Sequence, residues 1–256
     1  MSFAGEVVLV TGGAGGLGEA TVRRLHEAGA AVVIADVADE KATKLANELG
    51  NKVVYVRTDV LNDDDVQAAL AKADELGTLR YAVIAHGGFG VVDKVVGRDG
   101  SPAPLAGFTD TIALYLTGTY NVLRLAAAKI AATEPGVNGE RGAIVMTASI
   151  AGYEGQVGQS AYSAAKGGVI ALTLTGARDL SAVGIRLNSI APGTIRTPAM
   201  ERATDAMLAK FAETVPFPKR LGTPDEYANL AQHLLENTYI NGEVVRIDGA
   251  QRFQPR

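Results

Sequence analysis

Seven short apolar runs, rich in valine and isoleucine, recur along this 256-residue chain and alternate with longer segments of helical length. The runs are continuous rather than alternating in hydrophobicity, which is typical of strands covered on both faces. They occupy residues 7–12, 31–36, 53–59, 81–87, 143–149, 186–192 and 243–249. The helical segments span residues 16–28, 39–49, 62–76, 105–132, 160–181 and 223–237. This alternation predicts an α/β protein with a doubly wound, seven-stranded, mostly parallel sheet and helices on both faces.

Composition narrows the class of protein further. The chain contains no cysteine, which excludes disulfides, thiolate catalysis and zinc–cysteine sites, and we expect no metal centre. A net charge of −4 without a basic run gives no reason to expect nucleic acid as a partner. No linker or repeat divides residues 1–256, so we expect one domain. The N-terminus resembles no signal peptide, and no apolar run is long enough to cross a bilayer. We therefore expect a cytoplasmic protein with no membrane partner.

Two irregular stretches interrupt the alternation of strands and helices. Residues 88–104 are rich in glycine and proline and are too long for a simple turn. They suit a binding loop or a plain surface insertion equally well. Residues 193–222 follow the end of a predicted strand, where ligands bind in sheets of this type. We predict that this second stretch is a substrate loop.

The sequence TGGAGGLG, residues 11–18, links the first predicted strand to the first helix. Glycines at this spacing let the backbone turn tightly and approach a pyrophosphate, which the N–H groups of the helix N-terminus then bind. A plain glycine-rich turn is the alternative. The strand before the motif and the helix after it favour nucleotide binding. We predict that the following residues contact the cofactor: Thr11, Gly12, Gly16, Leu17 and Gly18.

Asp36 ends the second predicted strand, 18 residues after Gly18. A carboxylate at this distance accepts hydrogen bonds from the adenosine ribose and repels a 2′-phosphate, so NAD(H) is favoured over NADP(H). A helix-capping aspartate is the alternative. Asp59 ends the third strand, where it suits either an adenine contact or an N-cap.

Tyr162 and Lys166 are four residues apart in a predicted helix and therefore share one of its faces. A tyrosine pKa near ~10 is too high for a base at neutral pH, and lowering it by ~3 units takes ~4 kcal/mol. One unit charge at ~4 Å supplies about that much at an effective dielectric constant of ~20. Ser149 ends the fifth strand and could hold a substrate oxygen by a hydrogen bond. In isolation, a surface Tyr–Lys pair would be the simpler interpretation.

Taken together, these motifs resemble the short-chain dehydrogenase/reductase family over nearly the whole chain. The residues that carry the resemblance are TGGAGGLG at 11–18, Asp36, Asp59–Val60, Ser149, YSAAK at 162–166 and APGTIRTP at 191–198. The resemblance implies a single Rossmann-like domain that uses NAD. It implies that Tyr162 donates and accepts the proton, that Lys166 lowers the tyrosine pKa and binds the nicotinamide ribose, and that Ser149 orients the substrate. It also implies further cofactor contacts at Asp59, Val60, Gly87, Pro192, Gly193, Ile195 and Thr197.

A narrower resemblance, to the type-2 3-hydroxyacyl-CoA dehydrogenases, rests on GRDGSPAPLAGF at 97–108 and on the sequence around YEGQVGQSAYSAAKGGV. It implies a 3-hydroxyacyl-CoA substrate bound by Ser149, Gln156 and Tyr162, and a homotetramer. Two alternatives remain open at this stage. One is a hydroxysteroid or small secondary-alcohol dehydrogenase, and the other is a cofactor-binding protein with little turnover.

The chain departs from the family pattern at two places. Ile84 stands where the family has an asparagine after the fourth strand, and His86 stands where it has a small residue. Tyr115 aligns with the helix asparagine that holds a water linked to the catalytic lysine, while Asn121 would point elsewhere. Three outcomes are open: a slower enzyme, a substitute proton relay through Tyr115 or His86, or a site reshaped for another substrate. His86 itself suits a packing role better than a proton carrier.

Overall fold

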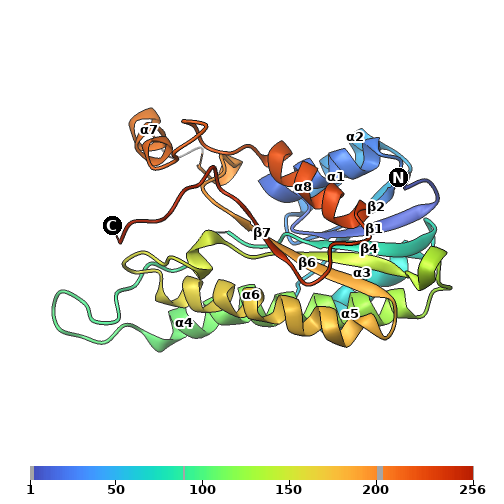
Figure 1. The fold of residues 1–256 in the computed structure, drawn as a ribbon, viewed down its shortest axis with the longest axis horizontal. Helices are drawn as coiled ribbons and strands as arrows, with labels where there is room; N and C mark the ends of the chain where they lie inside the picture. The colour runs from blue at the N-terminus through green and yellow to red at the C-terminus, as the bar shows by residue number, and fades with distance from the viewer. Residues whose placement is uncertain (1–2, 89, 201–203, 256) are drawn as a thin grey trace.

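The structure of the protein is a computed structural model that describes residues 3–88, 90–200 and 204–255. In these residues, seven parallel strands form one sheet (Figure 1). The strand order is β3-β2-β1-β4-β5-β6-β7, and every neighbouring pair is parallel. The strands are β1 (Glu6–Thr11), β2 (Ala31–Asp36), β3 (Val53–Arg57), β4 (Thr78–Ile84), β5 (Gly142–Thr147), β6 (Ile185–Pro192) and β7 (Val244–Ile247). The predicted doubly wound α/β fold is confirmed, and the sheet is wholly rather than mostly parallel.

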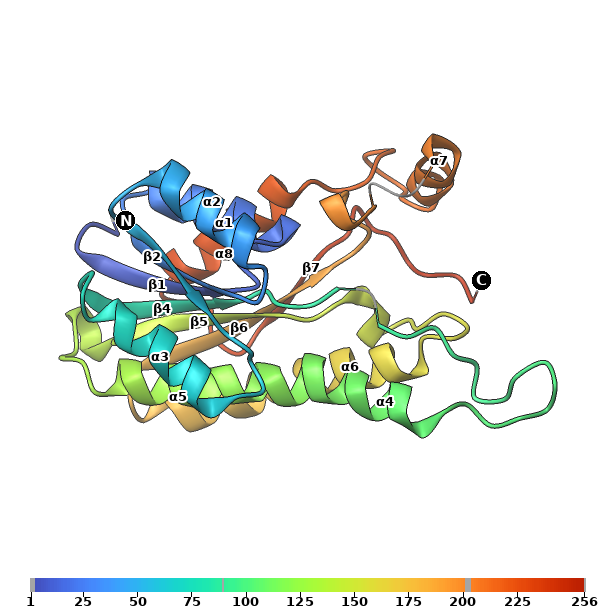
Figure 2. The same ribbon diagram turned by 180° about the vertical axis from the view of Figure 1, so that it is seen from behind.

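Helices cover both faces of the sheet (Figures 1 and 2). One face carries α1 (Gly16–Glu27), α2 (Asp39–Leu49) and α8 (Pro224–Glu236). The other carries α3 (Asp63–Ala73), α4 (Leu105–Ile112), α5 (Gly118–Ala131) and α6 (Ser160–Ser181). Within the described ranges, no helix is both long and apolar enough to pass through a membrane.

The apolar strand runs are buried because helices pack on both of their sides. Every residue of β5 and β6 is buried, and β1 is buried from Val7 onward. Alternate side chains of each strand enter one of two cores, for example Leu9 under α3 and α5, and Val10 under α1 and α8. This explains why continuous rather than alternating hydrophobicity marked the strands in the sequence.

Two predicted segments differ from the structure. The single helix expected over 105–132 is divided into α4 and α5 by a π-helical turn, Ala113–Thr117. The stretch 193–222, expected to be irregular, contains the helix α7 (Asp205–Glu213). Residues 201–203 of that stretch lie outside the described residues.

The order of the strands determines where a ligand can bind. The chain runs from β1 outward to β3 and then returns to place β4 on the other side of β1. Such a reversal opens a crevice at the carboxyl ends of the strands, between the two diverging crossovers. Thr11 ends β1 on this carboxyl-end side of the sheet, and the segments that follow β4 and β5 leave the sheet on the same side.

Candidate active site

Close backbone approaches require glycine in the turn between β1 and α1. A Cβ on Gly18 would lie 2.0 Å from the carbonyl oxygen of Gly12, and Gly12 itself has φ = +64°. Gly15 is the N-cap residue of α1 and provides no side-chain hydrogen bond to it. The N-cap therefore leaves the first-turn N–H groups available to an anion such as a pyrophosphate.

Asp36, the last residue of β2, is held beside this turn. One carboxylate oxygen accepts from the Ala14 N–H at 2.9 Å, and the other accepts from the Ala38 N–H at 2.9 Å. The helix-capping alternative is wrong, because Ala38 is the N-cap residue of α2. A carboxylate accepts about four hydrogen bonds, so capacity remains for ribose hydroxyls. The glycine turn and this fixed carboxylate fit the pyrophosphate and adenosine ribose of a dinucleotide.

Asp59 and Val60 follow β3 on the same carboxyl-end side of the sheet. Asp59 is exposed, and its carboxylate accepts from the Leu61 N–H at 2.9 Å. It is not an N-cap, because Asn62 caps α3. Val60 is buried, and its carbonyl accepts from the Asn121 side chain at 2.9 Å. Asn121 therefore positions the turn after β3.

The chain leaves β6 through the predicted nicotinamide segment. Pro192 is buried, and the Gly193 N–H donates to a carbonyl of β7 at 3.0 Å. Ile195 is buried as well. A Cβ on Gly16 would lie 2.9 Å from the Cβ of Thr197, so Thr197 lies against the first turn of α1. The segment after β6 and the phosphate-binding turn therefore face one another.

Ser149 and Tyr162 meet beyond the carboxyl end of β5. Ser149 is buried, and its hydroxyl oxygen accepts from the Ala151 N–H at 3.1 Å. The same hydroxyl is hydrogen-bonded to the phenol of Tyr162, which lies in the first turn of α6. Two neighbouring hydroxyls of this kind can both contact one substrate oxygen.

Lys166 lies one turn further along α6 and is anchored to β5. Its Nζ donates to the carbonyl of Thr147 at 2.7 Å and lies 5.9 Å from the ring centroid of Tyr162. The Thr147 hydroxyl donates to the carbonyl of Ile84 at 2.7 Å, so it accepts from the hydroxyl of Tyr227, 2.6 Å away. Sequence reasoning missed Thr147 and Tyr227, although Thr147 stands only two residues before Ser149.

Burial moves the pKa values of this pair in opposite directions. Burial raises the pKa of Tyr162, and the hydrogen bond from Ser149 only partly opposes it. Burial also lowers the pKa of Lys166 from 10.5 to about 7. With protein groups alone, the amine therefore loses its proton before the phenol does. A phenolate needs a further positive charge beside it, and an oxidised nicotinamide carries one.

His86 behaves as a packing residue. Its Nε2 lies 3.3 Å from the carbonyl oxygen of Leu114, so Nε2 carries the proton and donates it. Its Nδ1 then accepts from the Thr11 hydroxyl at 2.9 Å. Burial lowers the pKa of His86 to about 4, which keeps the ring neutral at pH 7. Protein groups thus contact both nitrogens, as the packing interpretation requires. The neighbouring Ile84 lies in the apolar core.

Gln156, predicted to bind substrate, contacts the C-terminal segment. Its side-chain N–H donates to the carbonyl of Gln254 at 3.1 Å, and the neighbouring Val157 N–H donates to the carbonyl of Pro255 at 3.0 Å. The last residues of the chain therefore run beside the loop that precedes α6. Nothing in the sequence motifs indicated this contact, and the substrate role of Gln156 stays a prediction.

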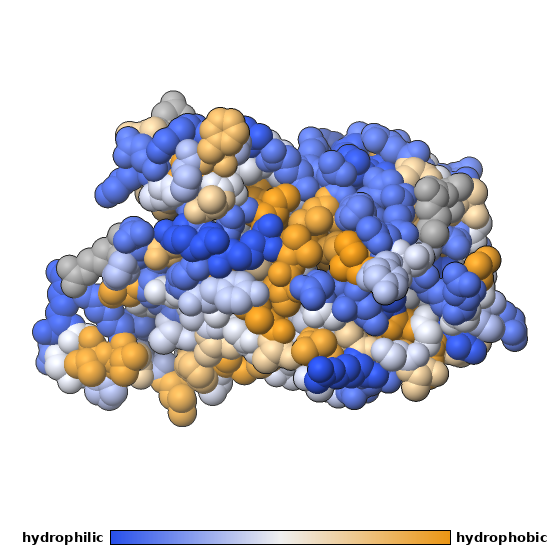
Figure 3. Space-filling model, viewed as in Figure 1, coloured by the Kyte–Doolittle hydropathy of each residue, from blue (hydrophilic) through white to orange (hydrophobic). Residues whose placement is uncertain are grey.

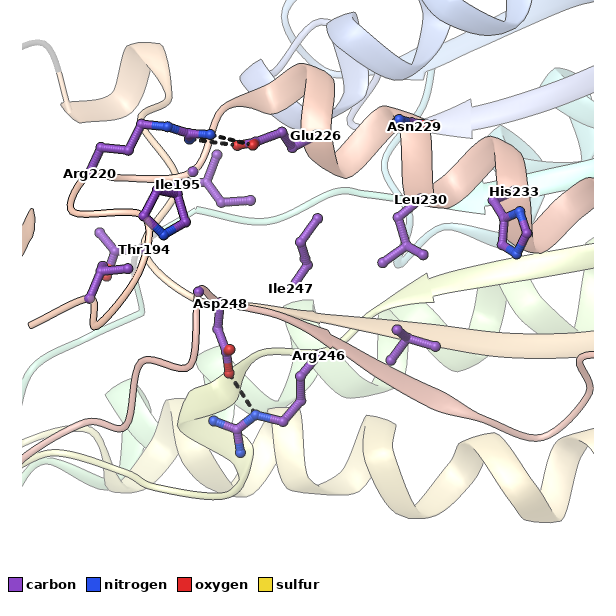
Figure 4. A pocket seen from close by; sticks show the side chains of 15 residues that line it. Thr194, Ile195, Arg220, Glu226, Asn229, Leu230, His233, Arg246, Ile247 and Asp248 are labelled. Atoms are coloured by element: carbon purple, nitrogen blue, oxygen red, sulfur yellow. Dashed lines mark hydrogen bonds and ion pairs between the residues drawn. The ribbon is translucent and has the colours of Figure 1, made fainter.

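A cavity of about 530 Å³ lies between α8, β7 and the segment 194–222 (Figure 4). Its apolar lining includes Ile195, Leu230 and Ile247, and ion pairs join Arg220 to Glu226 and Arg246 to Asp248 at its sides. Figure 3 shows an apolar strip near β7, flanked by hydrophilic surface. The residues that line the cavity do not include Ser149, Tyr162 or Lys166, so the cavity is distinct from that cluster.

Comparison with known proteins identifies the family of this chain. Residues 12–250 match the family described as enoyl-(acyl carrier protein) reductase. A 3-hydroxyacyl-CoA dehydrogenase type-2 of Drosophila melanogaster is 46% identical over 97% of this chain and 98% of its own length. That of Homo sapiens is 44% identical over 99% and 98%. The crystal structure of a 3-hydroxyacyl-CoA dehydrogenase type-2 from Mycobacterium avium matches with a TM-score of 0.98 and 65% identity, covering 99% of this chain and 98% of that one. These matches confirm the resemblance found in the sequence, and the chain belongs to the short-chain dehydrogenase/reductase family of oxidoreductases.

Proposed function

We propose that the protein transfers hydride between NAD(H) and a secondary alcohol or ketone, and that its substrate is a 3-hydroxyacyl-CoA. One observation carries the proposal: Ser149, Tyr162 and Lys166 lie together beyond the carboxyl end of β5. The glycine turn after β1 lies on the same side of the sheet. The names of the relatives at 44–46% identity support the choice of substrate. In this proposal the segment 193–222 is the substrate loop of a single domain.

Ser149, Tyr162 and Lys166 have different roles in the proposed reaction. Ser149 and Tyr162 hold the substrate hydroxyl, and the phenolate of Tyr162 takes its proton as the carbinol C–H bond breaks. Bound NAD⁺ supplies the hydride acceptor. The ammonium of Lys166 stabilises the phenolate, and the carbonyl of Thr147 fixes the position of that ammonium. Reduction of a ketone reverses these transfers, with Tyr162 as the proton donor.

The direct test is the loss of NADH absorbance with acetoacetyl-CoA, compared with a panel of ketosteroids and small ketones. We expect acetoacetyl-CoA to have the highest kcat/KM of the panel. A higher kcat/KM for a steroid or a small ketone would overturn the substrate proposal and leave the oxidoreductase intact. NADH binding without turnover on any member would contradict the whole proposal.

Asp36 is expected to set the preference for NAD(H). Asp36→Ala removes a charge-assisted acceptor for the ribose, so we expect the KM for NAD⁺ to rise roughly 10–100-fold. Loss of the repulsive charge should lower the KM for NADP⁺ at the same time. Asp64→Ala, an exposed carboxylate in the first turn of α3, is the matched control and should change neither. Equal KM values for NAD⁺ in Asp36→Ala and the parent protein would show that Asp36 does not bind the ribose.

We also propose that the protein assembles as a homotetramer. The supporting observation is that β7 is an edge strand and that an apolar strip lies near it on the surface (Figure 3). Exposed edges and apolar patches of this kind are typical of interfaces. Light scattering after gel filtration should give four times the 26.5 kDa chain mass. A single peak at one chain mass, across micromolar concentrations, would contradict the tetramer.

A further inference from the structure

Tyr115 occupies the π-helical turn that divides α4 from α5. The turn spans Ala113–Thr117, and the Gly118 N–H donates to the carbonyl of Ala113, five residues back. π-Helical turns inside α-helices occur frequently at functional sites. Tyr115 is 3% exposed although the helix around it also carries exposed residues such as Leu114. The irregular turn therefore directs a large aromatic ring into the protein.

The ring of Tyr115 contacts both members of the proposed proton-transfer pair. It meets the ring of Tyr162 edge to face, with centroids 5.3 Å apart and an interplanar angle of 89°. The Nζ of Lys166 lies 5.1 Å from the centroid of Tyr115, closer than the 5.9 Å to the centroid of Tyr162. Edge-to-face packing and cation–π contact are both favourable at these distances.

Groups in the segment that follows β4 fix the position of Tyr115. The Gly88 N–H donates to its phenol oxygen, and a Cβ on Gly87 would lie 2.9 Å from its Cε1, so only glycine fits at position 87. His86 is hydrogen-bonded to the carbonyl of Leu114, the residue before Tyr115. The two departures from the family pattern, at the end of β4 and in the long helix, are therefore one connected structure.

We propose that Tyr115 is a positioning residue whose ring face holds the buried ammonium of Lys166 beside Tyr162 in place of water. A buried ammonium needs partners that compensate for its lost hydration. The carbonyl of Thr147 is one such partner, and the ring of Tyr115 is another that lies closer than the ring of Tyr162. The proposal depends on the proposed function only in naming Tyr162 and Lys166 as the reacting pair.

The titratable groups around Lys166 indicate that Tyr115 acts through its aromatic ring and not as a proton relay. Tyr162 shares its helix, Tyr115 faces it from the π turn, His86 faces it from the end of β4, and Tyr227 reaches it from α8 through Thr147. His86 is neutral, with both ring nitrogens hydrogen-bonded. Burial, together with the charge of an ionised Tyr162, raises the pKa of Tyr115 to about 12, so Tyr115 keeps its proton.

Three substitutions separate the ring from the hydroxyl. Tyr115→Phe keeps the ring and removes the hydroxyl, while Tyr115→Leu and Tyr115→Met keep most of the volume and remove the aromatic face. The pKa of Lys166 is measured by NMR on protein with isotope-labelled lysine side chains, and Lys166→Arg identifies the signal. Tyr239→Leu, at a tyrosine that is 98% exposed, is the matched control. Thermal melting verifies that each variant is folded.

We expect Tyr115→Phe to leave the pKa of Lys166 within about 0.3 units and both non-aromatic variants to lower it by roughly one unit. In turnover, the non-aromatic variants should lose about tenfold in kcat with KM unchanged, and Tyr115→Phe should retain kcat. A shift in Tyr115→Phe equal to that in Tyr115→Leu, or no shift in the folded non-aromatic variants, would overturn the proposal. Because the NMR titration needs no substrate, it decides the role of Tyr115 even if acetoacetyl-CoA is not turned over.

Discussion

Tyr162→Phe is expected to reduce kcat with acetoacetyl-CoA on the order of 10³-fold while the Kd for NADH changes less than about threefold. In the proposed mechanism the phenol carries the substrate proton, and phenylalanine keeps the ring that packs against Tyr115. Only the hydroxyl and its hydrogen bond to Ser149 are lost. Steady-state NADH absorbance gives kcat, and NADH fluorescence gives the Kd.

Two comparisons make this result specific to the hydroxyl at position 162. Tyr239→Phe, at an exposed tyrosine, should retain the parent kcat. Ser149→Ala should lower kcat less than Tyr162→Phe, because it removes an orienting hydrogen bond and leaves the proton carrier in place. Retention of more than about a tenth of the parent kcat in Tyr162→Phe would mean that another group carries the proton.

Lys166→Met is expected to abolish turnover and at the same time to stabilise the protein by about 3 kcal/mol near pH 7. Burial lowers the pKa of Lys166 from 10.5 to about 7, which corresponds to roughly 4 kcal/mol of destabilisation near neutral pH. Loss of the hydrogen bond to Thr147 offsets about 1 kcal/mol of the gain. Urea unfolding followed by circular dichroism measures the difference.

The pH dependence of that gain has a defined sign. The unfolded chain keeps the lysine proton up to about pH 10.5, and the folded protein loses it near pH 7. The stability of the parent protein therefore rises with pH between these values, and the advantage of Lys166→Met should shrink toward zero near pH 10.5. Lys44→Met, at an exposed lysine on α2, should change stability by less than about 0.5 kcal/mol at every pH. A loss of stability in Lys166→Met at pH 7 would contradict the account.

The strands and the residues placed at their carboxyl ends could be predicted because they depend on short stretches of sequence. Continuous apolar runs predicted all seven strands, and the boundaries differ by three residues or fewer. The glycines of the first turn are required by a close contact between Gly12 and Gly18, which are only six residues apart in the sequence. The shared face of Tyr162 and Lys166 follows from helical geometry alone.

The features that the sequence did not reveal depend on contacts between distant segments. The π-helical turn has no characteristic residue composition. Its position depends on contacts with Gly87 and His86, which lie in the segment after β4. The anchor of Lys166 is a backbone carbonyl, which every residue possesses. The C-terminal segment beside Gln156 is likewise held through backbone groups. The family pattern marks Tyr115 as a departure, but only the fold shows that its ring contacts both Tyr162 and Lys166.

The pKa of Tyr162 with NAD⁺ bound provides the most direct test of the claim that a neighbouring ammonium makes this phenol acidic. Isotope-labelled tyrosine allows the phenol to be titrated by NMR, and Tyr162→Phe identifies the signal. We expect the phenol to ionise at lower pH with saturating NAD⁺ than without it, and Lys166→Met to raise its pKa by at least one unit in that complex. Identical titration curves for the parent protein and Lys166→Met would contradict the account.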